Sequence, residues 1–541
     1  MLDFEIILWL LFVAALVQPV ARRLDVPVAI AQVVAGLLLA AIPIMRRVQF
    51  DPELTFTLFV PPLLFWAATT GSLRDVRRNA RPILLLAVAL VLVTTAVVAL
   101  IAHAVAPELP WASAFVLGAI VAPPDADVTT SIARRLCVPP RLVTVLEGET
   151  LLNDTAAFVT YRMAVRAAMI GTFSLTSAAL GFVAIAAGGV LVGFAIGWMV
   201  AQLRRALSDS IVESTISLLT PFAAYIIAER IGASGVLAVV TAGFYFSRFV
   251  PRTVSARTRV RARGMWETVT FLVGGLVFTL IGVQLGRLAP ALWRSGDVSL
   301  LRVAAVVSAT VIVVRVVWVF LAAYVPRLAS PRLRARDPYP SWRTIAVLAW
   351  AGLRGGDTLV MVLAVPYRTA AGTPFPGRDT VIAVAFGVIV ATLLLQGLTL
   401  RPLIRGLAIP RDDSVETEER HARLEAARAA MRQLERVAER DHLPGGVLAY
   451  LRTTIRLRTR IDLDDIDHAG GHDGLTTEDT VRRVEQEIRD AARQAVVQLR
   501  DGNVIGQEAL RRIQNDLDLD EIRSVDELST GITKPERPPE S

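Results

Sequence analysis

Apolar residues recur in runs through residues 1–410, and short arginine-bearing loops separate one run from the next. A helix of about 20 apolar residues spans the hydrocarbon core of a bilayer, and many of these runs approach or exceed that length. Apolar periodicity and loop punctuation predict about thirteen spans. Their predicted starts lie near residues 4, 27, 53, 83, 111, 142, 176, 212, 234, 266, 299, 342 and 380. The pattern therefore predicts an all-α polytopic membrane protein.

The distribution of arginine predicts how these spans are oriented. Loops after the odd-numbered spans hold 22 arginines, whereas loops after the even-numbered spans hold about 8. Cytoplasmic loops are enriched in basic residues, so the asymmetry places the N-terminus outside and the C-terminal segment in the cytoplasm. We expect a multi-pass protein embedded in the lipid bilayer of the cell (inner or plasma) membrane.

Composition divides the chain into a membrane domain, residues 1–410, and a tail, residues 411–541. The chain has 541 residues, 54% of them hydrophobic, and a formal net charge of +8. The tail holds 21 basic and 29 acidic residues, so the basic excess lies in the membrane domain, where it sets orientation. The charge is therefore no sign of nucleic-acid binding. Apolar spacing and turn residues predict four tail helices, near residues 416, 447, 477 and 507.

Two spans carry residues that interrupt a helix. In the fifth, Pro123 and Pro124 remove two backbone donors, and Asp125 can cap the half-helix that follows. In the twelfth, Gly352-Leu-Arg-Gly-Gly356 concentrates backbone freedom around one buried cation. The two spans are seven apart and enter from opposite sides, which indicates inverted repeats with two crossed, broken helices. Paired interruptions of this kind mark a transporter site at the bilayer midplane.

The sixth span carries two carboxylates and an amide within an apolar run. Ionisable side chains at membrane depth cost roughly 3 kcal/mol on insertion scales, so they face a cavity, a partner or a transported ion. Glu149 and Asn153 lie four apart on one helix face, and Thr150 and Asp154 lie four apart on a face about 100° away. One pair can meet an ion while the other meets the scaffold.

Oxygen-bearing groups in these spans suit an alkali cation, which is a hard ion. Asp154, Thr150, carbonyls opened near Pro123 and water can supply the ligands. Burial disfavours a bare carboxylate, so a cation and a proton would compete for Asp154. Because Asn153 is neutral, one carboxylate titrates, which favours one proton per monovalent cation and no net charge moved. Neither a cofactor nor a catalytic residue is expected.

Other functional classes fit the sequence less well. The spans contain no His-Glu-x-x-His, no pairing of serine with histidine and no cluster suited to metal catalysis, which argues against a membrane enzyme. Passive cation channels use rings of carbonyls or charges around a pore. An isolated titratable site between two broken helices favours alternating access instead.

Seven short motifs follow one another along the membrane domain. They are Val60-Pro-Pro-Leu-Leu-Phe65, Pro123-Pro-Asp-Ala126, Glu149-Thr-Leu-Leu-Asn-Asp154, Ala228-Glu-Arg-Ile-Gly-Ala-Ser-Gly235, Phe278-Thr-Leu-Ile-Gly-Val-Gln-Leu285, Arg315-Val-Val-Trp318 and Gly352-Leu-Arg-Gly355. In this order they resemble the monovalent cation:proton antiporters, the sodium/proton exchangers of the NhaP-like bacterial branch. The resemblance covers nearly all of residues 1–410, and the adjacent asparagine and aspartate are its most telling feature.

The resemblance implies a homodimer in which a core bundle moves against a dimerisation bundle. It implies that Asp154 is the ion-binding aspartate, that Thr150 can lend a hydroxyl ligand and that Asn153 is the neutral member of the pair. Asp125 is a further candidate for ion binding, with neutralisation of helix ends as the alternative.

The same resemblance implies a set of supporting buried charges. Glu149 is expected to pair with Arg315, and Arg354 is a second buried arginine on the broken twelfth span. Glu229 either pairs with Arg230 at the end of a span or has a role in the core.

The chain departs from the family pattern at several positions. Trp66 stands where the family often has an acid, and Asp125 is followed by alanine within a run that is usually Thr-Asp-Pro. Conversely, Asp127 and Asp357 stand on the two broken helices where a small or apolar residue is usual. We hypothesise that one of these extra carboxylates replaces a missing oxygen donor or adds a titrating group.

The predicted function is exchange of sodium or lithium ions for protons, which would serve pH homeostasis. Exchange of potassium for protons on the same fold is the alternative, and a passive cation channel is a more distant one. The cytoplasmic helical tail is expected to regulate exchange or to support the dimer.

Overall fold

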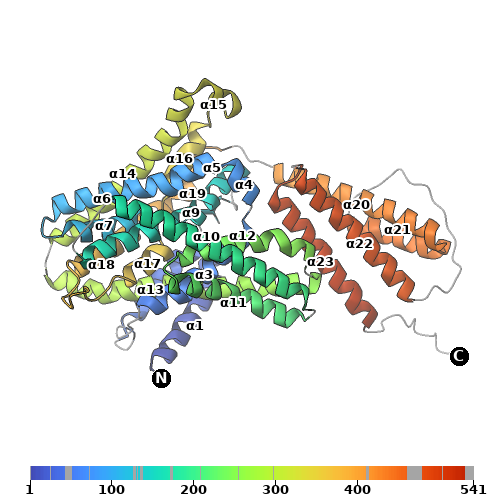
Figure 1. The fold of residues 1–541 in the computed structure, drawn as a ribbon, viewed down its shortest axis with the longest axis horizontal. Coiled ribbons are helices and arrows are strands. Elements are labelled where there is room, and N and C mark those ends of the chain that lie inside the picture. The colour runs from blue at the N-terminus through green and yellow to red at the C-terminus, as the bar shows by residue number, and fades with distance from the viewer. Residues whose placement is uncertain are drawn as a thin grey trace. The chain divides into compact units, whose positions relative to one another are not determined.

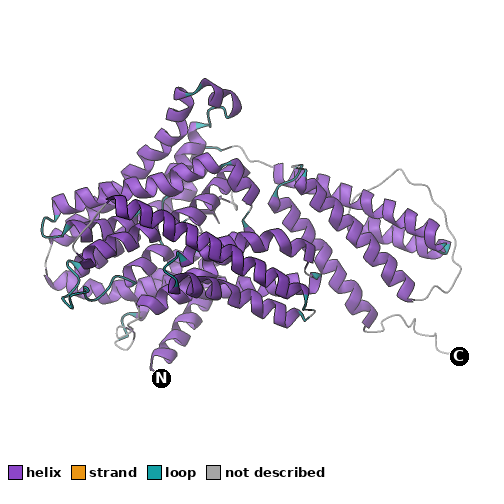
Figure 2. Cartoon of the chain, viewed as in Figure 1, coloured by secondary structure: helices purple, strands orange, loops and turns teal. Residues whose placement is uncertain are grey.

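The computed structural model is built from helices throughout the residues that it describes, which Figure 2 shows in purple with teal loops between them. Those residues include an isolated backbone bridge between Arg368 and Pro374 but no strand. The residues described are 2–24, 26–42, 45, 52–71, 73–125, 129–130, 132–133, 138–170, 175–207, 209–253, 255–295, 298–409, 414–459, 478–502 and 504–529.

The chain divides into two compact units. The membrane unit comprises Met1–Thr253 and Gly264–Arg411, and the tail unit comprises Val254–Arg263 and Asp412–Ser541. The labels in Figure 1 follow the helices of both units along the chain. One helix, α13, contributes its first turns to the tail unit and its remainder to the membrane unit.

Helices of the membrane unit begin close to the predicted starts, with α13 as the exception because it begins well before residue 266. The elements are α1 (Leu2–Arg23), α2 (Val28–Leu39), α3 (Pro52–Thr70), α4 (Leu73–Arg78), α5 (Ala80–Leu84), η2 (Leu85–Ala89), α6 (Leu90–Val105), α7 (Trp111–Val121), α9 (Pro140–Ile170), α10 (Leu175–Arg205), α11 (Ser210–Arg230), α12 (Gly235–Thr253), α13 (Ala256–Ser295), α14 (Val298–Ala329), α15 (Pro331–Arg336), α16 (Trp342–Trp350), α17 (Gly356–Leu363), α18 (Arg378–Thr392), η3 (Leu393–Gly397) and α19 (Leu398–Gly406).

Length and composition agree with a membrane-spanning fold. Among the described residues, seven helices are long and apolar enough to cross a membrane. Shorter apolar helices lie at Val28–Leu39, Thr57–Thr70, Trp111–Val121 and Gly235–Arg248. The predicted all-α class is confirmed, and the figure of thirteen spans stays a prediction.

The membrane unit contains two groups of helices that pack mainly within themselves. The first, here the scaffold bundle, is α3, α10, α11 and α12. The second, here the crossing bundle, is α5, η2, α6, α7, α9, α14, α16, α17 and α18. Small residues allow close packing in the scaffold bundle: a Cβ on Gly193 of α10 would overlap the carbonyl oxygen of Ala238 in α12. The two bundles meet where α3 contacts α17 and α9, and where α12 contacts α9.

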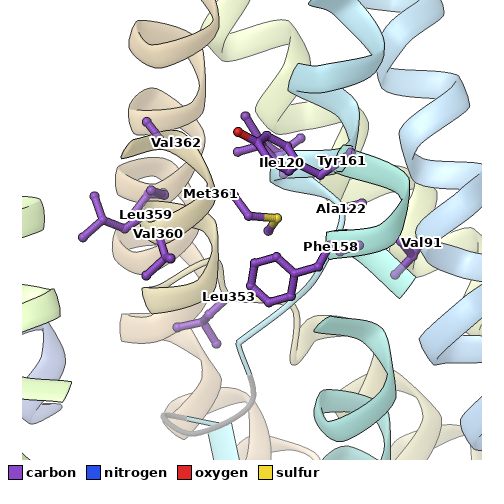
Figure 3. Close-up of a cluster of buried hydrophobic side chains, with 14 of the residues drawn as sticks. Val91, Ile120, Ala122, Phe158, Tyr161, Leu353, Leu359, Val360, Met361 and Val362 are labelled. Atoms are coloured by element: carbon purple, nitrogen blue, oxygen red, sulfur yellow. The ribbon is translucent and has the colours of Figure 1, made fainter. Parts of the chain in front are cut away.

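Both predicted interruptions are present in the crossing bundle. Helix α7 ends at Val121, just before the two prolines, and residues 351–355 between α16 and α17 are not helical. The interrupted segments meet, because the backbone N–H of Asp125 donates to the carbonyl of Leu353 at 2.7 Å. Beside this point Phe158 of α9 and Met361 of α17 point toward each other (Figure 3). A cluster of buried apolar side chains therefore packs beside the crossing.

The tail unit is a helical bundle with its own core. Its helices are α20 (Ser414–Asp441), α21 (Gly445–Thr459), α22 (Glu478–Asp501) and α23 (Gln507–Ser529), close to the four predicted. Leu434, Val484 and Leu510 lie in its buried cluster.

Within the tail unit, the first turns of α13 are held by an ionic network. Arg259 donates to the carboxylate of Asp518, and Arg493 donates to the same carboxylate at 3.2 Å and to Glu521 at 2.7 Å. Arg263 donates to Asn515 Oδ1 at 3.0 Å. These bonds account for the grouping of residues 254–263 with the tail.

Candidate functional site

Glu149 of α9 and Arg315 of α14 form a buried ion pair. Arg315 Nη1 lies 2.5 Å from Glu149 Oε1 and Nη2 lies 3.1 Å from Oε2, with each side chain 1% exposed. Nη2 also donates to the carbonyl of Leu348 in α16 at 3.2 Å. This is the pairing that the family resemblance implied. Removing one partner of such a pair is strongly destabilising, so the pair holds α9, α14 and α16 in fixed relation.

Arg354 binds the carbonyl end of the interrupted helix α7. Its Nε donates to the carbonyl of Val121 at 2.8 Å and its Nη2 to that of Ala122 at 3.0 Å, while Nη1 donates to Gly352. The backbone N–H of Arg354 donates to the hydroxyl of Thr392 at 3.1 Å. A cation is favourable at the negative end of a helix dipole. The buried arginine predicted on the twelfth span therefore closes the broken end of the fifth.

Asp125 performs the reciprocal contact at the start of α17. Its Oδ2 accepts the backbone N–H of Gly356, the first residue of α17, at 3.0 Å, and the residue is 7% exposed. A Cβ on Gly355 would overlap that same Oδ2, so only glycine lets the carboxylate approach this closely. This is the helix-end contact that the sequence analysis gave as the alternative role of Asp125.

Asp154, Asn153 and Thr150 lie on α9 alongside the opened backbone. Asp154 is 1% exposed and Asn153 is fully buried. Asn153 Nδ2 donates to the carbonyl of Pro124 at 3.0 Å, and its Oδ1 has no hydrogen-bond partner in the described part of the chain. The Thr150 hydroxyl donates to the carbonyl of Leu146 at 3.1 Å, which leaves its oxygen able to accept or to coordinate. One helix thus carries a buried carboxylate, a buried amide and a half-buried hydroxyl within a single turn and a half.

The crossing bundle holds several buried charged groups. Among the described residues they include three carboxylates and two guanidiniums: Asp125, Glu149, Asp154, Arg315 and Arg354. Glu149 and Arg315 pair with each other, and Asp125 and Arg354 bind the ends of the interrupted helices. Burying a charge is costly unless it is compensated, so each of these groups depends on its surroundings.

The structure corrects the predicted surroundings of Glu229. This residue is not a deeply buried charge: its side chain is 25% exposed, and its partner is Arg162 of α9, not Arg230. Arg162 Nη2 lies 2.6 Å from Glu229 Oε2. Neighbouring residues of one helix point about 100° apart, which is why Glu229 and Arg230 do not face each other.

The two extra carboxylates have different outcomes. Asp127 lies outside the described residues. Asp357 is half-buried in the first turn of α17, where a carboxylate faces the positive end of the helix dipole. Trp66, at the position of the missing acid, stacks on Trp266 with ring centroids 6.0 Å apart.

Sequence reasoning missed several buried polar side chains. The hydroxyls of Thr129 and Thr358 and the amide of Gln396 are buried without a hydrogen-bond partner in the described part of the chain. Thr392, which binds Arg354, was also missed. Thr392 and Gln396 lie four apart in an otherwise apolar run, so a search for polar pairs at helical spacing could have found them.

Comparison with known proteins identifies the family. The family model described as "Sodium/hydrogen exchanger, transmembrane" matches residues 8–406. An uncharacterized Na+/H+ exchanger of Mycobacterium tuberculosis is 33% identical over 531 residues, covering 97% of each chain. The chain belongs to the sodium/hydrogen exchanger family. This family is one of cation/proton antiporters, which are transporters rather than enzymes, and its members are multi-pass membrane proteins.

Two further likenesses add to this assignment. The Na+/H+ antiporter ApNhaP of Aphanothece halophytica is 32% identical over 403 residues, covering 74% of this chain and 73% of the relative. The solved sodium proton antiporter MjNhaP1 of Methanocaldococcus jannaschii superposes with a TM-score of 0.57 at 16% identity. That match covers 75% of this chain and 99% of MjNhaP1, and it supports the predicted antiporter fold.

Proposed function

We propose that the protein exchanges sodium or lithium ions for protons across the cell membrane, and that cation and proton compete for Asp154. The observation that carries the proposal is the burial of Asp154, which is 1% exposed and adjoins an asparagine that binds the carbonyl of Pro124 in the opened backbone. A buried carboxylate is stabilised by one monovalent cation or by one proton, and the two compete for the same oxygen atoms.

The ligands for the cation would come mainly from α9. Asp154 supplies a carboxylate, Thr150 a hydroxyl oxygen and Asn153 the Oδ1 that has no hydrogen-bond partner among the described residues. Carbonyls near the break in α7 and water complete a shell of oxygen atoms, as a hard cation requires. Asp125 accepts the backbone N–H of Gly356 in this conformation, so we propose that it acts indirectly, through the helix end.

Exchange would be electroneutral, since Asp154 is the only titratable side chain of the adjacent residues Asn153 and Asp154. Asn153 is neutral at all relevant pH values, and Glu149 is engaged with Arg315 through two hydrogen bonds. One proton would therefore replace one monovalent cation. A strong dependence of the exchange rate on membrane voltage would instead assign a titrating role to Asp127 or Asp357.

Alternating access would arise from motion of the crossing bundle against the scaffold bundle. We propose a homodimer in the cell membrane with the N-terminus outside and the tail, residues 411–541, in the cytoplasm. In this proposal the tail regulates exchange or supports the dimer. The arginine asymmetry of the loops supports this orientation.

Exchange of potassium for protons is the second candidate. A relative from Bacillus pumilus, 31% identical over 432 residues, is named a sodium, potassium, lithium and rubidium/H+ antiporter. The chain spans 63% of that relative's length. An oxygen-lined site around one carboxylate accepts any alkali cation in principle, so the order of preference must be measured. A passive cation channel is the third and is less well supported, because channels rely on rings of carbonyls or charges.

The decisive experiment is cation-driven proton movement in everted vesicles loaded with an acridine dye. Sodium, lithium and potassium are added in turn across a pH series. We expect fluorescence recovery with sodium and lithium in the wild type, an apparent KM that rises as the pH falls, and no recovery with Asp154→Asn.

Asp379→Asn is the matched control, since Asp379 is an exposed carboxylate in the first turn of α18. It should keep wild-type exchange. Full exchange by Asp154→Asn would refute the proposal, and cation flux without counter-moving protons would indicate a channel.

A further inference from the structure

An ion pair joins the two bundles of the membrane unit. Arg162 belongs to α9 in the crossing bundle, whereas Glu229 belongs to the last turn of α11 in the scaffold bundle. Their charged atoms lie 2.6 Å apart, and the side chains are 45% and 25% exposed. The pair is thus partly exposed, unlike the pair of Glu149 and Arg315, in which each side chain is 1% exposed.

Glu229 is fixed within the scaffold bundle. Its Oε1 accepts the backbone N–H of Gly235, the first residue of α12, at 2.9 Å. The chain turns between α11 and α12 through Gly232, whose φ of +75° favours glycine. A Cβ on Gly235 would lie 2.8 Å from Glu229 Oε1, so this contact also relies on glycine. One carboxylate oxygen is therefore used for the helix start, and the other is presented to Arg162.

The pair of Arg162 and Glu229 lies between Asp154 and the expected outer face of the membrane. Arg162 lies eight residues after Asp154 on the same helix, which is about 12 Å along the helix axis at 1.5 Å per residue. The turn between α11 and α12 follows an even-numbered span, so the topology prediction places it on the outer face. The way from Asp154 to that face runs along α9 toward this contact.

We infer that Arg162 and Glu229 form an outer latch, which holds the crossing bundle against the scaffold bundle while Asp154 communicates with the cytoplasm. The inference rests on the proposed alternating access. An exposed ion pair is weak and exchanges readily with water, so it can break and re-form in every transport cycle. The buried pair within the crossing bundle is costly to break and moves with its bundle. The buried pair would thus hold the crossing bundle together, and the exposed pair would stabilise one end state of that bundle's movement.

The latch is tested by fixing it covalently. Cys137 is the only cysteine of the chain, so a Cys137→Ser background is free of other thiols. Arg162→Cys and Glu229→Cys are introduced together and joined with a reducible bifunctional thiosulfonate as long as the replaced ion pair. Cross-linking is quantified by mass, and sodium/proton exchange is measured in proteoliposomes before and after reduction.

The matched control joins two residues at the same end of a single bundle. Gly188 of α10 and Ala233, before α12, are in contact, since a Cβ on Gly188 would lie 3.0 Å from the Cβ of Ala233. Gly188→Cys with Ala233→Cys, oxidised to a disulfide, links α10 to the start of α12 without spanning the two bundles.

The expected result is at least a tenfold loss of exchange in the cross-linked latch variant, recovery on reduction, and near wild-type exchange in the control. Exchange that survives quantitative cross-linking would overturn the latch, as would failure of the two cysteines to cross-link. Absence of exchange in the wild type would overturn the proposed function instead, so the two failures are distinguishable.

Discussion

Glu149 and Asp154 of α9 show how different surroundings give two carboxylates of one helix different roles. Glu149 faces a guanidinium that binds both its oxygens, and Asp154 neighbours an asparagine that carries no charge. Residues five apart on a helix point about 140° apart, so α9 shows the two acids to different neighbours. The first acid is compensated by its arginine, and the second is the one that we propose binds the cation or the proton.

Glu149→Gln is expected to destabilise the protein far more than a comparable change at the surface. It leaves the guanidinium of Arg315 buried beside a neutral group, which costs about 3–5 kcal/mol. Glu229→Gln, in an exposed pair, should cost less than about 1 kcal/mol. The free energies of unfolding of both variants in detergent, measured by denaturant titration, provide the comparison. Equal stabilities would mean that the buried pair contributes nothing beyond an exposed one.

The cost of burying an unpaired charge predicted some side-chain contacts but not others. The pairing of Glu149 with Arg315 followed from the cost of an unpaired charge at membrane depth together with the family resemblance. Of the two alternatives given for Glu229, pairing with Arg230 is not what the structure shows, because Arg230 is near only along the chain. Arg162 reaches it through the packing of α9 against α12 and its neighbours, which no local pattern encodes.

At the scale of the elements, the two interrupted helices stabilise each other. Arg354, from the break before α17, closes the carbonyl end of α7, and Asp125, from the break after α7, closes the amide end of α17. Each half-helix therefore finds its counter-charge on the other.

Gly355→Ala should disrupt this mutual capping of the two half-helices. Its methyl group would overlap Asp125 Oδ2, so the carboxylate would have to leave the first turn of α17. We expect at least a tenfold loss of exchange and a lower unfolding midpoint. Gly274→Ala is the control, because a Cβ there meets nothing within 4 Å. Unchanged exchange in Gly355→Ala would show that the cap is dispensable.

Both interruptions could be located from the sequence, because proline removes a helical hydrogen bond and glycine adds backbone freedom at its own position. The mutual capping could not be predicted, because it depends on how two helices that are distant in the sequence cross each other. The early start of α13 was missed for another reason. Residues 257–263 are rich in arginine, so hydropathy shows only the apolar part of a helix that begins at Ala256.

At the scale of the whole molecule, one helix belongs to both units. Arg259 and Arg263, on the first turns of α13, bind Asp518 and Asn515 of α23 within the tail unit. Asp518 is 4% exposed and accepts from two guanidiniums, so it is central to that network.

Asp518→Asn should loosen the first turns of α13, because Arg259 and Arg493 would remain close together without their shared carboxylate. Local opening exposes arginine to trypsin, so we expect cleavage within residues 257–263 to become several-fold faster. Asp501→Asn, at an exposed pair with Arg500, should leave the cleavage rate unchanged. Equal rates in the two variants would contradict a holding role for Asp518.

In the proposed mechanism, the burial of Asp154 has a consequence for how tightly the two ion fluxes are coupled. An empty carrier would move a bare carboxylate through the apolar surroundings of the crossing, whereas a bound cation or proton would neutralise that charge. Return of the empty carrier would therefore cost far more than return with either ion. Such a carrier would dissipate the gradient of one ion only by moving the other in the opposite direction.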